Sequence, residues 1–407
     1  MPDVSTLTVR LHDEPVGTLT RVGGDRTLFA FNDAYMADAE RPVLSLGFKD
    51  RFGELITDFK PVRTRLMPFF SGLLPEGQMR TYLARWAGVN PTREFFLLWA
   101  LGRDLPGAIT VEAADGGAWP AEAETGGENR GRGEEEKALR FSLAGVQLKF
   151  SAVLGAAGGL TIPARGVGGD WIVKLPAREY DGVPENEYAM MTLARLVGID
   201  VPAVRLLALG AIGNLPEEMG RLSGQAFAIK RFDRLGAGKA VHIEDFAQVF
   251  GVYPEAKYDK ASYRNVAAVL GVEGGDNDVA EFVRRLVFNT LIGNADMHLK
   301  NWSVIYPDQR RAALAPAYDL LSTVPYLPDE EAALKVSRTK RFDEFTEDEL
   351  THLAAKARLP EKLVLTTARE TVARFREHWA AERANLPLAR KVIDAVEAQL
   401  EKVPIAQ

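Results

Sequence analysis

Residues Leu291–Ser322 read LIGNADMHLKNWSVIYPDQRRAALAPAYDLLS, and this stretch decides how the rest of the chain is interpreted. Asp296 and Asn301 stand in the pattern D-x-x-x-x-N. A further acid, Asp319, follows what reads as two short strands, NWSVIY and RAALAPAY, around the turn PDQRR. Because a tight hairpin returns the chain to the point where it began, Asp319 is predicted to lie beside the loop that carries Asn301.

The spacing of Asp296 and Asn301 is that of a kinase catalytic loop. In such a loop the carboxylate accepts the hydroxyl proton of the substrate, and the amide oxygen binds magnesium without adding a second charge beside the base. The same pattern occurs by chance in many proteins, where helix capping is the common explanation. The presence of Asp319, as a second metal-binding carboxylate, favours a phosphoryl-transfer site over helix capping.

A phosphoryl-transfer site also needs a fixed cation for the nucleotide phosphates. Lys174 follows the β-prone run Trp171–Val173, and a helix is predicted to start at Pro184 with Glu185 and Glu187 in its first turns. Either acid can pair with Lys174, and the apolar residues that follow favour Glu187. The alternative is a solvated lysine at a strand end, with acids that only favour a helix N-terminus.

Two further stretches lie where a kinase would have its phosphate loop, before the strand lysine, and its adenine hinge, after it. RFSLAGVQLKFSAVL reads as two strands around Ala144 and Gly145, placed to cover nucleotide phosphates with backbone N–H groups. QAFAIKRFDRL reads as a strand that leads into a polar turn, where a two-lobed kinase binds adenine through its backbone. One glycine is weak evidence for a phosphate loop, and its position before the strand lysine is better evidence.

Composition limits the class of protein. The 407 residues are 46% hydrophobic and 26% charged, which predicts a full core and two or three domains. The absence of cysteine excludes disulfides and thiolate chemistry. No apolar run is long enough to cross a bilayer and the start does not read as a secretory signal, so a cytoplasmic location is expected. A net charge of -6 argues against broad attraction of this chain alone to nucleic acid.

The flanking regions carry structural signals and no obvious chemistry. TLTVRLHDEPVGTLTRV predicts a hairpin with its turn at Asp13–Gly17, and LPEGQMRTYLARWAGV predicts a helix with Pro75 and Glu76 in its first turn. REFFLLWALGRDLPGAIT predicts a buried helix and then a strand. Residues 115–137 are rich in Gly and Glu and predict a mobile linker. TEDELTHLAAKA predicts a capping box from Thr346 to Glu349, and a further helix is expected after Pro387.

Together these motifs resemble the HipA-type serine/threonine kinases of bacterial toxin-antitoxin modules. GLLPEG (72–77) and GRDLPGA (102–108) resemble the N-terminal region of that family. The resemblance to the rest of the family is carried by SLAGVQLKFS (142–151), IVKLP (172–176), ENEYAMMTLARLVGIDVP (185–202), IKRFDR (229–234), NADMHLKN (294–301) and YDLLS (318–322). GNAD stands where eukaryotic kinases have H-R-D, and no D-F-G occurs.

The resemblance implies an α+β, two-lobed protein-kinase-like fold with an N-terminal α/β subdomain and a mostly helical C-terminal lobe. The expected division is a subdomain at 1–114, the linker at 115–137, a nucleotide-binding region at 138–235 and the C-terminal lobe with the catalytic and metal-binding loops at 236–407.

It also implies an ATP- and magnesium-dependent kinase that acts as a toxin in growth arrest and persistence. The implied partners are a HipB-like helix-turn-helix antitoxin, which would contact DNA, and a protein target of the aminoacyl-tRNA synthetase type. Ser142 matches the autophosphorylated serine of the family, whose phosphate would repel those of the nucleotide and disfavour the closed loop. The alternative for Ser142 is a turn serine that bonds its own backbone.

The resemblance assigns catalysis to Asp296 and Lys300, the latter as a neutraliser of transferred phosphate, and magnesium binding to Asn301 and Asp319. His298 is expected to brace the loop. The expected ATP-binding set is Ser142, Ala144, Gly145, Gln147, Lys149, Lys174, Glu187, Lys230, Arg231, Phe232, His298, Asn301 and Asp319. Two other functions stay open: a small-molecule kinase, and an ATP-binding co-repressor joined to the antitoxin.

Overall fold

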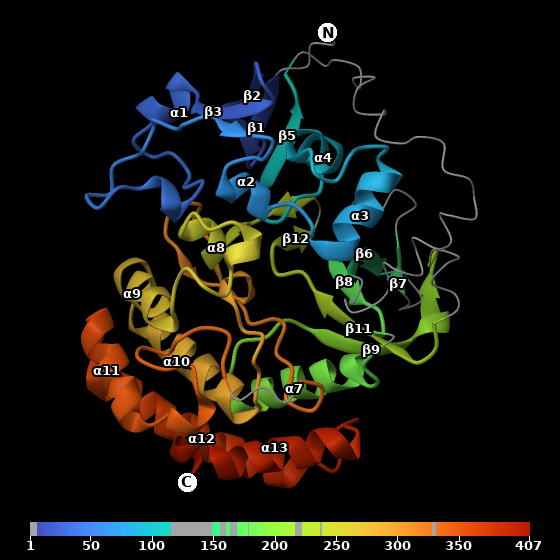
Figure 1. Ribbon diagram of the computed structural model, residues 1–407, viewed down its shortest axis with the longest axis vertical. Helices are drawn as coiled ribbons and strands as arrows, with labels where there is room; N and C mark the ends of the chain where they lie inside the picture. Colours follow the sequence, from blue (N-terminus) through green and yellow to red (C-terminus); the bar gives the residue numbers. More distant parts are fainter. Residues whose placement is uncertain are drawn as a thin grey trace. The chain divides into compact units, whose positions relative to one another are not determined.

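The computed structural model describes residues 6–114, 149–154, 160–162, 169–177, 179–215, 222–236, 238–327 and 331–407. They belong to two compact units, which are described separately (Figure 1). The first unit comprises Met1–Leu148, Asp233–Glu255 and Ile305–Arg310, and the second comprises Lys149–Phe232, Ala256–Val304 and Arg311–Gln407. The predicted linker at 115–137 lies outside the described residues.

The first unit is built on a five-stranded antiparallel sheet with the order β4-β3-β2-β1-β5. Its elements are β1 (Thr6–Leu11), β2 (Glu14–Val22), β3 (Arg26–Phe31), α1 (Asp33–Ala37), η1 (Leu46–Phe48), β4 (Val62–Arg63), α2 (Pro68–Gly72), α3 (Gly77–Trp86), α4 (Glu94–Leu101), β5 (Ile109–Ala113), β12 (Arg234–Gly236), β13 (Lys239–Ala240), β14 (His242–Asp245) and α8 (Phe246–Val249). The helix and strand predicted from REFFLLWALGRDLPGAIT are confirmed as α4 and β5.

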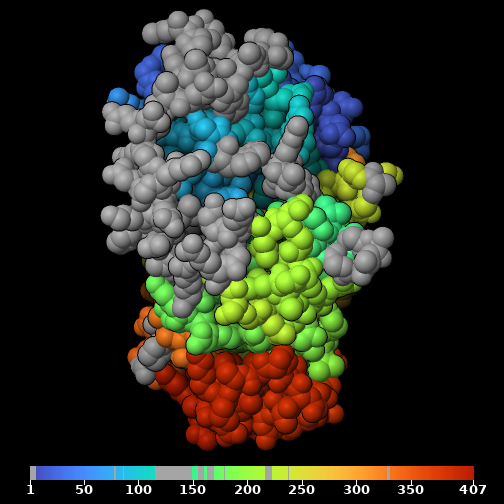
Figure 2. Space-filling model, turned by 90° about the vertical axis from the view of Figure 1, so that its right-hand side faces the viewer, coloured from blue at the N-terminus to red at the C-terminus, as the bar shows by residue number. Residues whose placement is uncertain are grey.

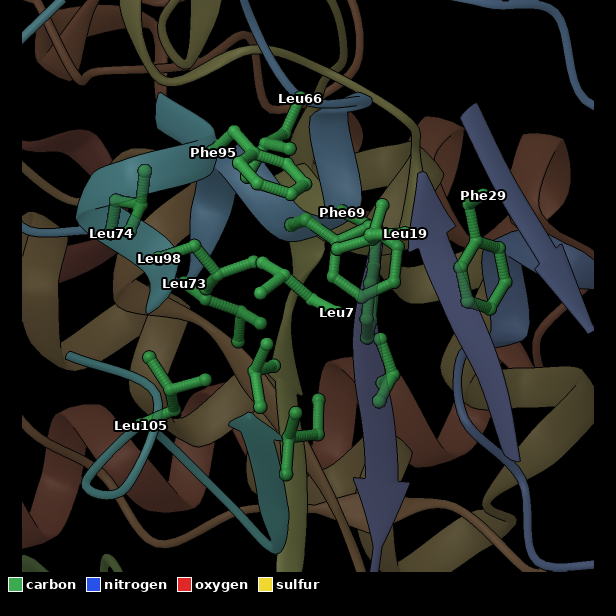
Figure 3. Packing of buried hydrophobic residues seen from close by; sticks show 14 of the residues in the cluster. Leu7, Leu19, Phe29, Leu66, Phe69, Leu73, Leu74, Phe95, Leu98 and Leu105 are labelled. Atoms are coloured by element: carbon green, nitrogen blue, oxygen red, sulfur yellow. The ribbon is translucent and has the colours of Figure 1, made fainter. Parts of the chain in front are cut away.

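The core of the first unit follows from the alternation of apolar residues along its strands. In β1 every second side chain is buried, and Leu7 has no exposed surface. Figure 3 shows Leu7 and Leu19 of the sheet close to Phe69 of α2. Phe29 packs against Phe70 with ring centroids 4.9 Å apart.

The predicted N-terminal hairpin is confirmed, but its turn was placed too late. The turn is formed by His12 and Asp13, which both have positive φ (52° and 66°), the requirement of a two-residue type I′ hairpin turn. Gly17 lies inside β2. A Cβ there would come within 2.5 Å of the Ala30 carbonyl oxygen, so this glycine serves close strand packing and not the turn.

The motif GRDLPGA holds Asp233–Glu255 in the first unit. The Gly107 N–H donates to the Asp233 carboxylate at 2.9 Å, and Arg234 donates to the Gly107 carbonyl at 2.8 Å and to Asp104 at 3.1 Å. Gly107 has a φ of 74°, and a Cβ on it would meet the Ile243 nitrogen at 2.8 Å. The close approach of two backbones therefore requires glycine at this position.

Glu244 in β14 is a buried acid surrounded by donors. Its carboxylate accepts hydrogen bonds from Ser45 Oγ at 2.6 Å, from the Leu46 N–H at 2.7 Å and from the Tyr306 hydroxyl. Burial raises the pKa of Glu244 to about 7, although these donors favour the ionised form. His242, whose Nε2 lies 2.8 Å from the Leu44 carbonyl oxygen, has a pKa lowered by burial to about 4.

Glu244 should make stability depend on pH. Its pKa is raised on folding, so its contribution is fully present below the unfolded value near 4.5 and is lost as pH rises through about 7. His242 acts in the opposite sense, because a lowered pKa costs stability as pH falls. We therefore expect the parent to lose ~3 kcal/mol of unfolding free energy relative to Glu244→Gln when the pH rises from 4.5 to 8. Urea unfolding at both pH values measures it, and a pH-independent difference would contradict it.

The second unit contains a six-stranded sheet with the order β10-β7-β6-β8-β11-β9. Its strands are β6 (Lys149–Leu154), β7 (Leu160–Thr161), β8 (Trp171–Lys174), β9 (Val204–Ala208), β10 (Ile212–Gly213) and β11 (Gln225–Lys230), and the short 3-10 turn η2 (Leu209–Ala211) precedes β10. The long helix α7 (Val183–Val197) lies along this sheet (Figure 1). The strands predicted from DWIVKLP and QAFAIKRFDRL are confirmed as β8 and β11.

The remainder of the second unit is mainly helical, as predicted. It contains α9 (Tyr263–Glu273), α10 (Asp276–Leu291), η5 (Leu299–Asn301), the strands β15 (Ser303–Tyr306, with its last two residues in the first unit) and β16 (Ala313–Leu314), η6 (Phe342–Glu344), α11 (Glu347–Ala357), α12 (Glu361–Glu382), α13 (Arg390–Lys402) and η7 (Pro404–Ala406). α10 packs on α12 through Phe288 and Phe375, whose ring centroids are 5.6 Å apart. In Figure 2 the C-terminal helices, in red, adjoin the green segment that includes α7.

The capping box predicted at Thr346 is only half formed. The Thr346 hydroxyl accepts from the Glu349 N–H at 3.2 Å, as a helix cap requires. The Glu349 carboxylate does not accept from the Thr346 N–H, which would be the second bond of a capping box. It accepts instead from the N–H groups of Ser337, Arg338 and Thr339, so Glu349 fixes the loop that precedes the helix.

Candidate active site

Lys174 is the buried cation of the second unit. It ends β8, it is 4% exposed, and its ammonium group forms ion pairs with Glu187 and Asp319. Glu187 is buried on α7, whereas Glu185 is half-buried, so of the two candidate acids it is Glu187 that pairs with Lys174. The helix begins after Gly182, which has a φ of 78°, and carries Pro184 in its first turn.

Strand register places a second lysine at the same acid. Lys149 of β6 is directly opposite Lys174 of β8, and Phe227 of β11 is opposite Lys174 on the other side. Lys149 Nζ lies 3.1 Å from Asp319 Oδ2, and Lys174 Nζ lies 5.4 Å from the centre of the Phe227 ring. Asp319 is therefore bound by one lysine on each carboxylate oxygen.

The charges of this cluster are strongly coupled. Burial alone would raise the pKa of Asp319, but Lys149 and Lys174 outweigh burial and hold that pKa well below its usual range. Burial would lower the pKa of Lys174, but Asp319 and Glu187 outweigh it and raise that pKa. Burial raises the pKa of Glu187. Lys174 is consequently charged at any physiological pH, and Asp319 is ionised.

Asp319 reaches this position through an unusual backbone conformation. Its φ is 56°, in the left-handed region that aspartate tolerates better than most residues. The chain arrives from the hairpin of β15 and β16, and the Ala315 N–H donates to the Ser303 carbonyl at 2.9 Å. The Asn294 side chain donates to the backbone carbonyl of Asp319 at 3.4 Å. The predicted return of Asp319 to the loop of Asp296 is confirmed by this bond.

The loop that carries Asp296 is fixed by amide side chains. It follows α10, and the Asp296 N–H donates to Asn294 Oδ1 at 3.0 Å while Asn294 Nδ2 donates to Asn289 Oδ1 at 2.8 Å. Asn301, in η5, donates through Nδ2 to the Asp296 carbonyl at 2.8 Å. The five-residue spacing of Asp296 and Asn301 thus closes one compact loop.

Tyr258 was not identified from the sequence. Its hydroxyl donates to Asp296 Oδ1 at 2.5 Å, although the two residues are 38 positions apart. The tyrosine ring meets the His298 ring edge to face, with centroids 4.9 Å apart. The Asp296 side chain is 52% exposed, so its carboxylate remains open to an incoming molecule.

His298 and Lys300 have different environments. Burial lowers the pKa of His298 to about 3, so His298 is a neutral imidazole at physiological pH. This fits the expected bracing role. Lys300 is half-buried, and its carbonyl accepts from the Tyr318 hydroxyl at 2.9 Å.

Of the three residues expected at the adenine hinge, Lys230 is the last residue of β11, and Arg231 and Phe232 follow it. The N–H groups of Lys230 and Arg231 donate to the carbonyls of Ala203 and Asp170, each at 2.8 Å, and the Lys230 side chain is exposed. Phe232 stacks on Tyr318, with centroids 5.8 Å apart. Phe232 therefore packs against the residue that precedes Asp319 in the sequence. Ser142, Ala144, Gly145 and Gln147 lie outside the described residues.

The donor set suits magnesium. Within the described residues no group of three or more His, Cys, Asp and Glu side chains could hold a metal ion. Asn301 and the ionised Asp319 supply oxygen donors, and magnesium in nucleotide sites is typically held by one or two carboxylates together with phosphate oxygens and water. These two residues would hold the ion.

Comparison with known proteins gives the family. Residues 141–379 match the HipA-like C-terminal domain, and residues 7–112 match the HipA N-terminal domain. The chain belongs to the HipA-like kinases. It is 60% identical over its whole length to the Sinorhizobium fredii protein named "Putative kinase Y4dM", of which the match covers 98%. It is 26% identical to the "Serine/threonine-protein kinase toxin HipA" of Shewanella oneidensis, over 84% of this chain and 81% of that protein.

The HipA fold is seen in a solved structure as well. The complex titled toxin-antitoxin system HipA, HipB and its operator DNA, from Shewanella oneidensis, superposes with a TM-score of 0.72 at 21% identity and covers 98% of this chain and 96% of that one. The predicted α+β, two-lobed HipA-like fold is confirmed. The helices in the described part of this HipA-type kinase include none that is long and apolar enough to cross a membrane.

Proposed function

We propose that this HipA-type kinase transfers the γ-phosphoryl group of ATP to serine or threonine hydroxyls of a protein and acts as the toxin of a toxin-antitoxin module. The observation that supports the chemistry best is the buried ammonium of Lys174 between Glu187 and Asp319. A buried ion pair gives little net stability, and strongly perturbed groups gather at functional sites.

In this proposal each side chain has one task. Asp296 accepts the proton of the acceptor hydroxyl, whose oxygen attacks the γ-phosphorus while the bond to the β-phosphate oxygen breaks and ADP leaves. Lys174 binds the nucleotide phosphates and is oriented by Glu187. Asn301 and Asp319 hold magnesium, which neutralises negative charge on the phosphates when bound.

The remaining predicted residues have supporting tasks. Lys149 comes shortly after Ser142 in the sequence. When the nucleotide binds, its ammonium group would exchange Asp319 for the phosphates. Lys300 neutralises the transferred phosphoryl group, and His298 braces the loop as a neutral ring. Lys230, Arg231 and Phe232 contact adenine through the Phe232 ring and through backbone groups other than the Lys230 and Arg231 N–H groups, which already donate to Ala203 and Asp170. Ala144, Gly145 and Gln147 line the phosphate loop.

Self-phosphorylation of Ser142 is the first test of this function. After incubation with magnesium and ATP, we expect intact-mass and peptide mass spectrometry to find one phosphate, on Ser142. Asp296→Ala should carry none, because the base is absent, and Ser142→Ala should lack the modification while the site is otherwise complete. An unmodified parent protein that transfers phosphate to no protein but turns over a small metabolite would contradict the proposal.

The partners follow from the relatives and stay proposals for this chain. The solved Shewanella complex is titled as containing HipB and operator DNA, and we propose that a HipB-like helix-turn-helix antitoxin binds this chain and contacts DNA. A chain with a net charge of -6 gains little from DNA by itself. Coexpression with such a protein and a DNA mobility-shift assay, with each protein omitted in turn, tests this. The proposed acceptor is a protein of the aminoacyl-tRNA synthetase type.

A further inference from the structure

The Tyr258 hydroxyl is bound to the Asp296 carboxylate, where the hydroxyl of the acceptor must bind for phosphoryl transfer to occur. It donates a hydrogen bond to Oδ1 at 2.5 Å. During transfer the acceptor hydroxyl must donate to the same carboxylate before its proton moves. A phenol O–H and an aliphatic O–H can each donate one hydrogen bond to a carboxylate. The tyrosine therefore imitates the acceptor.

The Tyr258 side chain is partly exposed, so its hydroxyl can move away from Asp296. The residue is 37% exposed and lies between η4 (Pro254–Ala256) and α9, where the chain has no regular structure. Its ring rests edge-on against His298, and Lys257 Nζ lies 5.7 Å from the ring centre. Tyr263 provides a contrast: it is 2% exposed, and its hydroxyl donates to the Met297 carbonyl at 2.9 Å, so it is a buried support of the loop.

We propose that Tyr258 is an internal stand-in for the acceptor, which occupies Asp296 in the resting enzyme and is displaced by the hydroxyl of the protein substrate. This inference rests on the proposed kinase function. Water is the competing acceptor: its oxygen attacks the γ-phosphorus, its proton passes to Asp296, and ADP and phosphate leave. Tyr258 would compete with water for Oδ1 of Asp296, and it would select for substrates that bind tightly enough to move the ring.

The test compares Tyr258→Phe with the parent, both in a Ser142→Ala background that prevents self-phosphorylation. Phenylalanine keeps the ring against His298 and removes only the hydroxyl. The acceptors are water, measured as phosphate release, and a synthetic peptide of residues 138–150. Tyr253→Phe is the matched control, because it removes a half-buried hydroxyl that donates to the Leu66 carbonyl at 3.2 Å.

We expect phosphate release by Tyr258→Phe to rise about tenfold and the KM for the peptide to fall about tenfold, with kcat for the peptide nearly unchanged. Tyr253→Phe should behave as the parent. Unchanged values in Tyr258→Phe would overturn the inference. A fall in kcat for both acceptors would also overturn it, because the hydroxyl would then orient the base. A parent that transfers phosphate to neither acceptor would overturn the kinase proposal itself.

Discussion

Replacing Asp296 by asparagine is expected to lower the rate of phosphoryl transfer by about 10²–10⁴-fold and to leave nucleotide binding nearly unchanged. The amide has the shape of the carboxylate and can still accept from Tyr258, but it cannot take the acceptor proton. Because the Asp296 side chain is 52% exposed, the exchange leaves no buried group without a partner. The measurement is the single-turnover rate of Ser142 phosphorylation, with binding of a fluorescent ATP analogue measured in parallel.

The matched control is Asp259→Asn, an exposed acid in the same irregular segment as Tyr258. It removes one negative charge without touching the base, so its rate should equal that of the parent. An Asp296→Asn rate within about threefold of the parent would mean that proton removal contributes little, as a loose transition state permits. It would assign Asp296 a role in loop structure only.

Lys174→Met is expected to abolish transfer and also to destabilise the chain by about 3–5 kcal/mol. Lys174 is 4% exposed and Glu187 is 1% exposed, so the single change leaves a buried carboxylate without its cation. Activity should be lost for a different reason, because in the proposed function Lys174 is the fixed cation that binds the nucleotide phosphates. Urea unfolding and nucleotide binding measure the two effects separately.

A second variant separates stability from chemistry. Lys174→Met combined with Glu187→Leu removes both buried charges, so we expect most of the lost stability to return while nucleotide binding stays weak. Lys149→Met is the matched control, because this lysine is 48% exposed and Asp319 keeps its ion pair with Lys174, so we expect a smaller loss of stability than for Lys174→Met. A double variant no more stable than Lys174→Met would contradict this account of the pair.

The parts of the site that local patterns describe could be predicted from the sequence. The spacing of Asp296 and Asn301 fits within one loop, and the hairpin that returns Asp319 is short, so neither needs knowledge of distant contacts. The choice of Glu187 over Glu185 followed from the apolar face of one helix. These residues are grouped by sequence periodicity before any packing is known.

Contacts between distant segments could not be predicted in the same way. Tyr258 contacts Asp296 although the two residues are 38 positions apart. In the sequence Tyr258 is an ordinary aromatic residue between two helices, and nothing local marks it as part of the site. The second use of Glu349, on the loop of Ser337, and the strand position of Gly17 likewise depend on what packs against them. For Glu349 and Gly17 local chemistry suggested a cap and a turn, and tertiary contacts determined the outcome.

Lys149 and Lys174 give the proposed nucleotide site a further property. Each of the two Asp319 oxygens is bound by an ammonium group, so the protein supplies its own counter-ions before any ligand arrives. A metal ion alone would have to displace lysines from Asp319, and a nucleotide alone would bring several negative charges next to it. Entry of both together lets the lysines exchange a carboxylate for phosphate oxygens. Loading of the site should therefore proceed as an exchange of ion partners, with magnesium and nucleotide each raising the affinity for the other.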